Sequence, residues 1–302
     1  VLEMGISDFG EMTRLTEIAK PDYCVITNIG QCHLENLGSR EGILKAKTEI
    51  FKSMNPDGCV FLNGEDDMLA TVKKPWKNEI IRFGMSKKDA VYATDVVNKG
   101  LLGSEAVIHV ADTQFPVRVP LPGVHMVLNA LAATAVGWQL GLTTEQIAEG
   151  IAQVQAVAGR SHVIETPDYI LIDDCYNANP VSMKAAIDLL GTALQRKVAI
   201  LGDMFELGKD EAALHAQIGE YAMTHGVDVL ICIGELSKHM YDRAVETSSG
   251  KEQGSREIYY FPTREEAMAQ IPHILHTGDA VLIKASHSMK FEEIVEQSTG
   301  QI

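Results

Sequence analysis

The chain has 302 residues and a formal net charge of −15, and its length allows two domains of ordinary size. The acidic balance argues against nucleic acid as a partner, because a protein that binds the phosphate backbone normally presents a basic face. The sequence has no run of about 18 apolar residues and no basic-then-apolar leader, so we expect neither a membrane span nor a secretion signal. Its five cysteines form no C-x-x-C pair, and we expect reduced core thiols of a cytoplasmic protein, not zinc ligands.

The first half of the sequence predicts a strand, a helix and then several more strands. The apolar run 23–29 predicts the first strand, and Ser39 is the expected N-cap of a helix that continues to about Met54. Further strands are expected at 59–63, 79–83, 90–97, 105–110 and 115–119. Two helices should follow, one from about Gly123 to Gly141 and one after Thr143 or Thr144.

The second half alternates strictly between strands and helices. Strands are expected at 169–173, 197–201, 227–233, 257–261 and 280–284. Helices are expected at about 181–195, 210–225, 235–247 and 263–271, with a last one from near Met289. Regular alternation is typical of an α/β fold whose parallel sheet is covered on both faces and joined by right-handed crossovers. The two halves should meet near 157–163.

Polar residues directly after predicted strands are the first candidates for a site, because open α/β sheets bind ligands beyond the carboxyl ends of their strands. In the first half these residues are Glu3, Asn28, His33 and Glu35. In the second half they are Asp173, Asp174, Asp203, Glu235 and Lys284. Carboxylates and an imidazole suit a hard divalent cation that carries a phosphate ligand. For any one residue taken alone, ordinary loop polarity is the stronger interpretation.

The stretch 201–210, LGDMFELGKD, is not a phosphate-binding P-loop. Five residues separate its glycines, and Asp210 stands where a P-loop needs a serine or threonine for magnesium. Elsewhere, His125 and Asn129 are four residues apart, so a helix would place them on one face. An asparagine amide matches the donor and acceptor of an adenine edge, although a solvated asparagine is the simpler interpretation.

The stretch 171–186, LIDDCYNANPVSMKAA, is denser in polar residues. Asn179 is the expected N-cap of the helix that follows, with Pro180 at its first position. This explanation leaves Asp174, Tyr176 and Asn177 unaccounted for on a turn at the ligand edge of the sheet.

Together these stretches resemble the Mur ligase family of cell-wall synthesis, and most closely its branch that uses D-alanyl-D-alanine. In family order, the motifs are EMGISDFGEM (3–12), NIGQCHLENLGS (28–39), KAKTEIF (45–51), GVHMVLNALAA (123–133), GRSHV (159–163), DDCYNANPVSM (173–183) and LGDMFELG (201–208). Several are shared with folylpolyglutamate synthases.

The resemblance implies three domains: a UDP-sugar-binding domain, a P-loop ATPase domain and a Rossmann-like domain that receives the incoming amine. This chain should then hold an N-terminally incomplete ATPase domain at 1–159 and the Rossmann-like domain at 160–302. Because Val1 opens inside a strand-like run, we expect a fragment without the first domain and the P-loop. The hinge between the domains is expected near Gly159.

The resemblance also implies the site residues. Glu3 and His33 would bind Mg²⁺, and Lys47 would be carbamylated, since a carbamate offers oxygen ligands whereas an ammonium would repel the metal. These three residues would form the catalytic group. The residues implied for ATP are Asn129, Arg160 and Asp174, with weaker support for Tyr176, Asn177 and His125. The residues implied for the substrates are Asn179, Ser182, Lys284, Ser286 and His287.

The implied activity is an ATP-dependent, ADP-forming ligase with ATP and Mg²⁺ as cofactors. It would add D-alanyl-D-alanine to UDP-N-acetylmuramoyl-tripeptide through an acyl phosphate, as a monomer, and the fragment alone would be inactive. The sequence departs from the family pattern at Met126 and in the stretch KASHSM (284–289), which has Ala285 and His287. The second departure concerns the choice of amine, because a histidine stands where the fixed charge of an arginine would suit a substrate carboxylate. The alternatives are therefore a related Mur-type or polyglutamate-type ligase with another amine substrate, and a non-catalytic nucleotide-binding relic.

Overall fold

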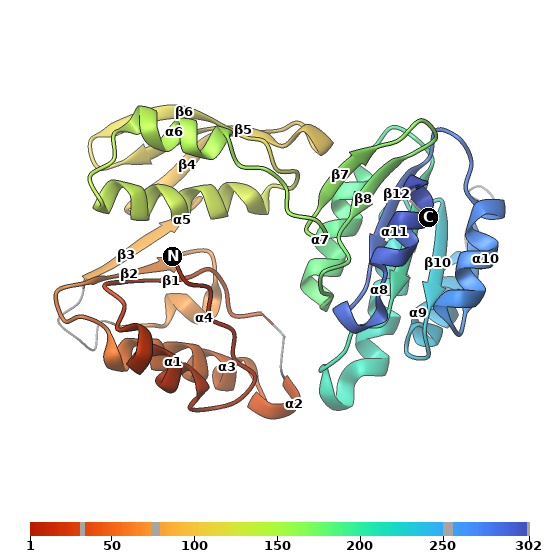
Figure 1. The fold of residues 1–302 in the computed structure, drawn as a ribbon, viewed down its shortest axis with the longest axis horizontal. Coiled ribbons are helices and arrows are strands. Elements are labelled where there is room, and N and C mark those ends of the chain that lie inside the picture. Colours follow the sequence, from red (N-terminus) through yellow and green to blue (C-terminus); the bar gives the residue numbers. More distant parts are fainter. Residues whose placement is uncertain (31–33, 74–78, 250–255, 301–302) are drawn as a thin grey trace. The chain divides into compact units, whose positions relative to one another are not determined.

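The computed structural model describes residues 1–30, 34–73, 79–249 and 256–300. The chain divides into two compact units, Val1–Gln155 and Ala156–Ile302, each built around one six-stranded sheet (Figure 1). This division falls a few residues before the boundary expected between residues 159 and 160. Across the described ranges, no helix is long and apolar enough to cross a membrane.

The strands of the first unit lie side by side in sequence order. They are β1 (Tyr23–Ile26), β2 (Cys59–Asn63), β3 (Glu79–Gly84), β4 (Val91–Asn98), β5 (Ser104–Val110) and β6 (Thr113–Val119). The pairs from β1 to β4 are parallel, whereas β4–β5 and β5–β6 are antiparallel. The short connections before β5 and β6 explain the change, since a tight turn can only join antiparallel strands.

The helices of the first unit precede, interrupt and follow this sheet. The α-helices are α1 (Glu11–Ala19), α2 (Leu34–Leu37), α3 (Arg40–Lys47), α4 (Asp67–Ala70), α5 (His125–Gln139) and α6 (Thr144–Ala152). The 3₁₀ helices are η1 (Thr48–Ser53) and η2 (Gly100–Leu102). Thr143 caps α6 in a capping box, and Gly141 ends the preceding turn with a φ of 81°, as the sequence predicts.

Two apolar clusters hold the first unit together, one on each face of the sheet. Phe61 packs with Phe83, Ile108 and Leu131 of α5. Its neighbour Leu62 packs with the other cluster, which includes residues of α3 and α4. Alternate residues of a strand point to opposite faces, so β2 contributes to both cores.

Two predicted elements of the first unit end earlier than expected by three residues or more. The strand expected at 23–29 ends at Ile26. The helix expected to reach Met54 is α-helical only to Lys47 and then continues as η1. At that point the Thr48 hydroxyl donates to the Leu44 carbonyl at 2.7 Å, and such back-bonding competes with regular helical hydrogen bonds.

The sheet of the second unit has the order β11-β10-β9-β12-β8-β7. Its strands are β7 (His162–Glu165), β8 (Ile170–Asp173), β9 (Lys197–Gly202), β10 (Val229–Ile233), β11 (Glu257–Phe261) and β12 (Ala280–Lys284). All pairs are parallel except β7–β8. The five predicted strands are therefore parallel as expected. The strand β7 was not predicted and adds an antiparallel edge, where the Thr166 N–H donates to the Tyr169 carbonyl and closes a hairpin.

Helices cover both faces of this second sheet (Figure 1). They are α7 (Pro180–Gly191), α8 (Glu211–Thr224), α9 (Ser237–Ser248), α10 (Arg264–Ile274) and α11 (Glu292–Thr299), with the 3₁₀ helices η3 (Gly208–Asp210) and η4 (His287–Met289). The strands β9, β10 and β12 are buried along their length, apart from Lys197. The predicted α/β class is confirmed. Because β12 lies between β8 and β9, the loops after these three strands meet at one edge.

Candidate functional site

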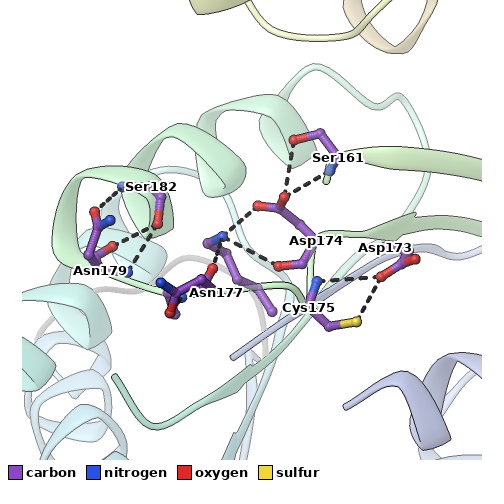
Figure 2. A network of polar contacts seen from close by, with 9 residues as sticks. Ser161, Asp173, Asp174, Cys175, Asn177, Asn179 and Ser182 are labelled. Carbon is purple, nitrogen blue, oxygen red and sulfur yellow. Dashed lines mark hydrogen bonds and ion pairs between the residues drawn. The ribbon is translucent and has the colours of Figure 1, made fainter. Parts of the chain in front are cut away.

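The turn after β8 is tied to the segment 159–161 at the start of the second unit. The Gly159 N–H donates to Asp173 Oδ2 at 2.7 Å, and the Tyr176 N–H donates to the Gly159 carbonyl at 2.9 Å. The Ser161 N–H and hydroxyl both donate to Asp174 Oδ1, at 2.8 and 3.3 Å (Figure 2). These contacts join residues 159–161 and 173–177 into one structure, which we call the clasp.

The clasp holds an unusual backbone conformation around Arg160. Gly159 has a φ of 77° and Ser161 a φ of 48°, so both neighbours of Arg160 are left-handed. A residue with a Cβ pays roughly 1–2 kcal/mol for this conformation. The two hydrogen bonds from Ser161 to Asp174 offset that cost. Ser161 was not a predicted site residue, and its place in the GRSHV motif is the one signal that pointed to it.

Lys284 lies beneath the clasp at the end of β12 and is only 2% exposed. Its ammonium donates to Asp174 Oδ2 at 2.6 Å, to the Asn177 carbonyl at 2.8 Å and to the Asp174 carbonyl at 3.4 Å. A lysine has three N–H donors, so all of them are used. The sequence predicts that Lys284 contacts a substrate, but these contacts place its head group inside the protein.

Two exposed side chains of the clasp, Arg160 and Tyr176, stack on each other. The Arg160 guanidinium lies over the Tyr176 ring, 4.1 Å from its centroid, and Tyr176 is 49% exposed. The His287 ring, from the loop after β12, is 5.8 Å from the same tyrosine ring. A planar cation on an aromatic face at the ligand edge of the sheet suits an anionic or planar ligand.

Asn179 and Ser182 act together at the start of α7. The Ser182 N–H donates to Asn179 Oδ1 at 2.9 Å, and the Asn179 N–H donates to Ser182 Oγ at 3.1 Å. This capping box, with Pro180 at the first helical position, confirms the predicted N-cap. The substrate role expected of the same two residues stays a prediction.

The loop after β9 is joined to the loop after β12 by a buried network. Asp203 Oδ1 accepts from the N–H and the hydroxyl of Ser237, both at 2.7 Å. Ser286 donates its N–H to the Asp203 carbonyl and accepts the Phe205 N–H on its hydroxyl, both at 3.0 Å. Ser286 is thus engaged in the framework, and its predicted substrate contact stays a prediction. Phe205 remains exposed at this edge.

A fully buried histidine anchors the same loop. The Met204 N–H donates to His215 Nε2 at 2.9 Å, and His215 Nδ1 lies 2.7 Å from the Glu211 carbonyl. Nε2 must therefore accept, which places the proton of the neutral ring on Nδ1. Burial lowers the pKa of His215, so the neutral form is favoured.

In the first unit, four side chains hold the backbone that follows β1. Lys47, the last residue of α3, donates from Nζ to the Asn28 carbonyl at 3.1 Å. Asn63 donates to the Thr27 carbonyl at 2.9 Å, and Asp66 Oδ2 accepts the Ile29 N–H at 2.7 Å. Arg40 donates to the Ile29 carbonyl at 3.1 Å. The structure therefore brings Lys47 to the strand end at which the sequence predicts a metal site.

The other residues predicted for a site in the first unit are Glu3, His33, His125 and Asn129. Glu3 is exposed in the N-terminal segment, and His33 lies outside the described residues. The described ranges contain no group of three or more His, Cys, Asp or Glu side chains that could hold a metal ion. The magnesium site expected of Glu3, His33 and Lys47 therefore stays a prediction. His125 and Asn129 are both exposed on the first turns of α5, on one face as predicted.

The thiols fit the expectation of an unreactive core. Cys24, Cys59, Cys175 and Cys232 are buried and form no disulfide, whereas Cys32 lies outside the described residues. Burial raises the pKa of Cys24 to about 12, so this thiol stays protonated at neutral pH. Burial, together with the adjacent Asp173 carboxylate, likewise raises the pKa of Cys175.

Comparisons with known proteins agree with this fold along almost the whole chain. The family model of the Mur ligase middle domain matches residues 1–137, and that of the Mur ligase glutamate ligase domain matches residues 159–287. A UDP-N-acetylmuramoyl-tripeptide–D-alanyl-D-alanine ligase from Bacillus subtilis is 33% identical over 98% of this chain and 63% of the relative. The ligase of the same name from Escherichia coli is 31% identical over 98% of this chain and 64% of the relative.

Solved structures show the same similarity in three dimensions. MurF from Acinetobacter baumannii has a TM-score of 0.89 at 28% identity, over 99% of this chain and 64% of that chain. MurF from Thermotoga maritima, solved in complex with ADP, has a TM-score of 0.84 at 26% identity, over all of this chain and 67% of that chain. Both units thus have the architecture of Mur ligase domains. The chain belongs to the Mur ligase family, and it spans 63% and 64% of the lengths of the two curated relatives.

Proposed function

We propose that this chain is part of an ATP-dependent ligase that adds D-alanyl-D-alanine to UDP-N-acetylmuramoyl-tripeptide. One observation carries the proposal: curated relatives that bear this activity in their names are 31–33% identical over 98% of the chain. We further propose that residues 1–159 contribute to the ATPase domain and residues 160–302 form the domain that receives the dipeptide. We expect the protein to act in the cytoplasm as a monomer.

The chemistry follows from the difficulty of joining a carboxylate to an amine in water. The peptide carboxylate attacks the γ-phosphate of ATP, ADP leaves, and the resulting acyl phosphate carries a good leaving group. The amine of the dipeptide then attacks the acyl carbon, inorganic phosphate leaves and an amide forms. The protein's contribution to such a reaction is positioning and charge stabilisation.

The residues of the second unit support nucleotide binding at the clasp. We propose that Arg160 and Tyr176 contact ATP with the stacked faces that they expose. Asp174 already accepts from Lys284 and twice from Ser161, which leaves its carboxylate about one further acceptor position for a ligand hydroxyl. Asn177 is proposed to line the same turn.

In the first unit, His125 and Asn129 are proposed to face the adenine of ATP. Magnesium, when bound, would neutralise phosphate charge, and Glu3, His33 and a carbamylated Lys47 are its proposed ligands. Lys47 is compatible with carbamylation because a carbamate keeps one N–H on Nζ, which can still donate to the Asn28 carbonyl. The proposed contacts to the second substrate are Asn179, Ser182, Ser286 and His287.

Ligation should be measured on the product of the complete gene and, in parallel, on the 302-residue chain. With ATP, Mg²⁺ and both substrates, we expect the complete product to release ADP and to form the pentapeptide precursor. Arg160→Ala should raise KM for ATP, whereas the exposed control Arg118→Ala should not. Turnover of ATP and tripeptide with other amines but not with D-alanyl-D-alanine would refute the assignment.

The carbamate at Lys47 has its own test. With bicarbonate labelled with carbon-13, the wild-type chain should show a carbamate resonance at mildly alkaline pH. Lys47→Arg should lose that resonance, and Lys45→Arg, on the same helix and exposed, should keep it. A spectrum that is unchanged in Lys47→Arg would contradict the proposal.

A related ligase with a different amine substrate is the second candidate. His287 stands exposed at the ligand edge, 5.8 Å from Tyr176, in a stretch where the sequence departs from the family pattern. A panel of amines in the same ligation assay separates the two candidates.

A further inference from the structure

Lys284 is a buried cation whose surroundings fit it closely. It is 2% exposed, and each of its N–H donors faces an oxygen of the turn after β8. A buried ammonium is tolerated only when it is paired and hydrogen-bonded. Asp174 provides the opposite charge, and the Asn177 carbonyl provides the second strong acceptor.

The contacts of Asp174 connect Lys284 to the opposite side of the clasp. One carboxylate oxygen accepts from Lys284. The other accepts from the N–H and the hydroxyl of Ser161 (Figure 2). Asp174 therefore bridges β12 and the start of β7. If Lys284 were absent, this half-buried carboxylate would lose its cation, and its hold on Ser161 would weaken.

Ser161 in turn sets the position of Arg160. Its left-handed φ of 48° is unfavourable for serine and is offset by the contacts to Asp174. The adjacent Arg160 guanidinium lies 4.1 Å from the Tyr176 ring centroid, and the Tyr176 N–H is bound to the Gly159 carbonyl. The geometry of the exposed Arg160–Tyr176 pair thus depends on contacts that begin at Lys284.

We propose that Lys284 is a positioning residue that fixes the clasp and thereby presents Arg160 and Tyr176 to the ligand. It acts through Asp174 and does not touch the substrate, in contrast to the contact that the sequence predicts for it. That the ligand is a nucleotide rests on the proposed function. The structural part of the proposal, that Lys284 fixes the position of Arg160, does not depend on the proposed function.

Amide hydrogen exchange tests the structural part on the 302-residue chain without any ligand. In Lys284→Met, exchange at Ser161 and Tyr176 should become at least about tenfold faster, because their acceptors are held by the clasp. The core amide of Ile187 in α7 should keep its protection, so a local effect is distinguished from general destabilisation. Lys209→Met, at an exposed lysine of η3, is the matched control and should change none of these rates.

A second readout follows the side chains themselves. The Arg160 protons should be shifted upfield by the ring current of Tyr176 in the wild-type chain, and this shift should be lost in Lys284→Met. A folded Lys284→Met that keeps both the slow exchange and the shifted arginine protons would overturn the proposal. If that variant does not fold, Asp174→Asn removes the same ion pair at nearly equal volume. Faster exchange and loss of the ring-current shift would then support the proposal, and wild-type values of both would overturn it.

Nucleotide affinity then tests the link to the proposed function. ADP binding to the product of the complete gene should weaken by about tenfold or more in Lys284→Met, as expected when an outer partner of a binding group is lost. It should be unchanged in Lys209→Met. If wild-type protein does not bind ADP, the proposed function is contradicted, while hydrogen exchange still decides whether Lys284 fixes the clasp. Wild-type affinity in Lys284→Met would refute the positioning role.

Discussion

Glu49 should stabilise α1 from a distant part of the sequence. Its carboxylate oxygen Oε2 accepts from the Gly10 N–H at 3.0 Å, the Thr13 N–H at 3.3 Å and the Thr13 hydroxyl at 2.8 Å. Gly10 is the N-cap of α1 and has no side chain to cap the helix. Replacing Glu49 with alanine leaves these three donors without their acceptor and removes a negative charge from a helix N-terminus.

The size of the effect can be worked out from these contacts. Loss of an N-cap costs roughly 0.5–2 kcal/mol, and the favourable charge at the helix start adds about 0.3–1 kcal/mol. Gly10 is exposed, so water can replace part of the lost contact. We therefore expect Glu49→Ala to lower the free energy of unfolding of the first unit by about 2 kcal/mol. Glu49→Gln keeps the shape and one acceptor and should cost about half as much.

Thermal unfolding measures this change directly. A unit of this size shifts by roughly 2–4 °C per kcal/mol, so Glu49→Ala should lower its melting temperature by about 4–8 °C. In Glu49→Ala, the amides of α1 should exchange faster than in the wild type, whereas those of α5 should keep their wild-type rates. Glu17→Ala, at an exposed glutamate in the C-terminal half of the same helix, is the control. A melting temperature within one degree of wild type would refute the capping role.

The same carboxylate should make stability depend on pH. Burial by itself raises the pKa of Glu49, but the hydrogen bonds from Thr13 and the charge of Lys52 outweigh it, and the pKa is lowered overall. A lowered carboxyl pKa gives stability that is complete above the unfolded value of 4.5 and is lost as the pH falls through the folded value. Glu49→Ala should flatten this acid limb of the stability curve.

Three further substitutions test this structure: two at buried positions of the second unit, His215 and Gly219, and one at the exposed Gly150 of the first unit. Burial lowers the pKa of His215, so its stabilising effect should be complete above the unfolded pKa of 6.5 and decline as the pH falls below that value. The free energy of unfolding, measured by urea titration at several pH values, should depend less steeply on pH in His215→Gln. A Cβ at Gly219 would lie 2.0 Å from the Met240 carbonyl oxygen, so Gly219→Ala should cost about 3 kcal/mol or more by forcing α8 from α9. Gly150→Ala, in α6 with nothing near its Cβ, should instead stabilise by about 0.4–1 kcal/mol, and equal effects of the two substitutions would contradict this account.

Much of the second unit could be predicted because buried parallel strands are continuous apolar runs. The predicted runs KVAIL, VDVLICI and AVLIK match β9, β10 and β12 to within two residues at each end. The strand β7 gives a weaker signal, since it is a half-buried edge strand of four residues. The helix α1 was not predicted, because its cap comes from Glu49, 39 residues away from Gly10.

The candidate site was predictable in its location but not in its internal contacts. The strand-end rule places Asp174 and Lys284 at one edge of the sheet, as the structure shows. The sequence does not reveal that Lys284 points inward, since the last residue of a strand can face either side. It also does not reveal that Ser161 occupies two acceptor positions of Asp174. His33 lies outside the described residues, so its role as a ligand stays a prediction.

The clasp restricts where the chain between the two units can bend. Gly159, where the sequence predicts a hinge, has both its N–H and its carbonyl bound within the second unit. The Arg160 N–H is bound in turn to the Val157 carbonyl at 3.0 Å. Torsional freedom is therefore left to the few residues after α6, around Gln155 and Ala156. Arg160 is therefore fixed to the second unit on both sides, so its proposed contact with a nucleotide would not require residues 159–161 to become ordered first.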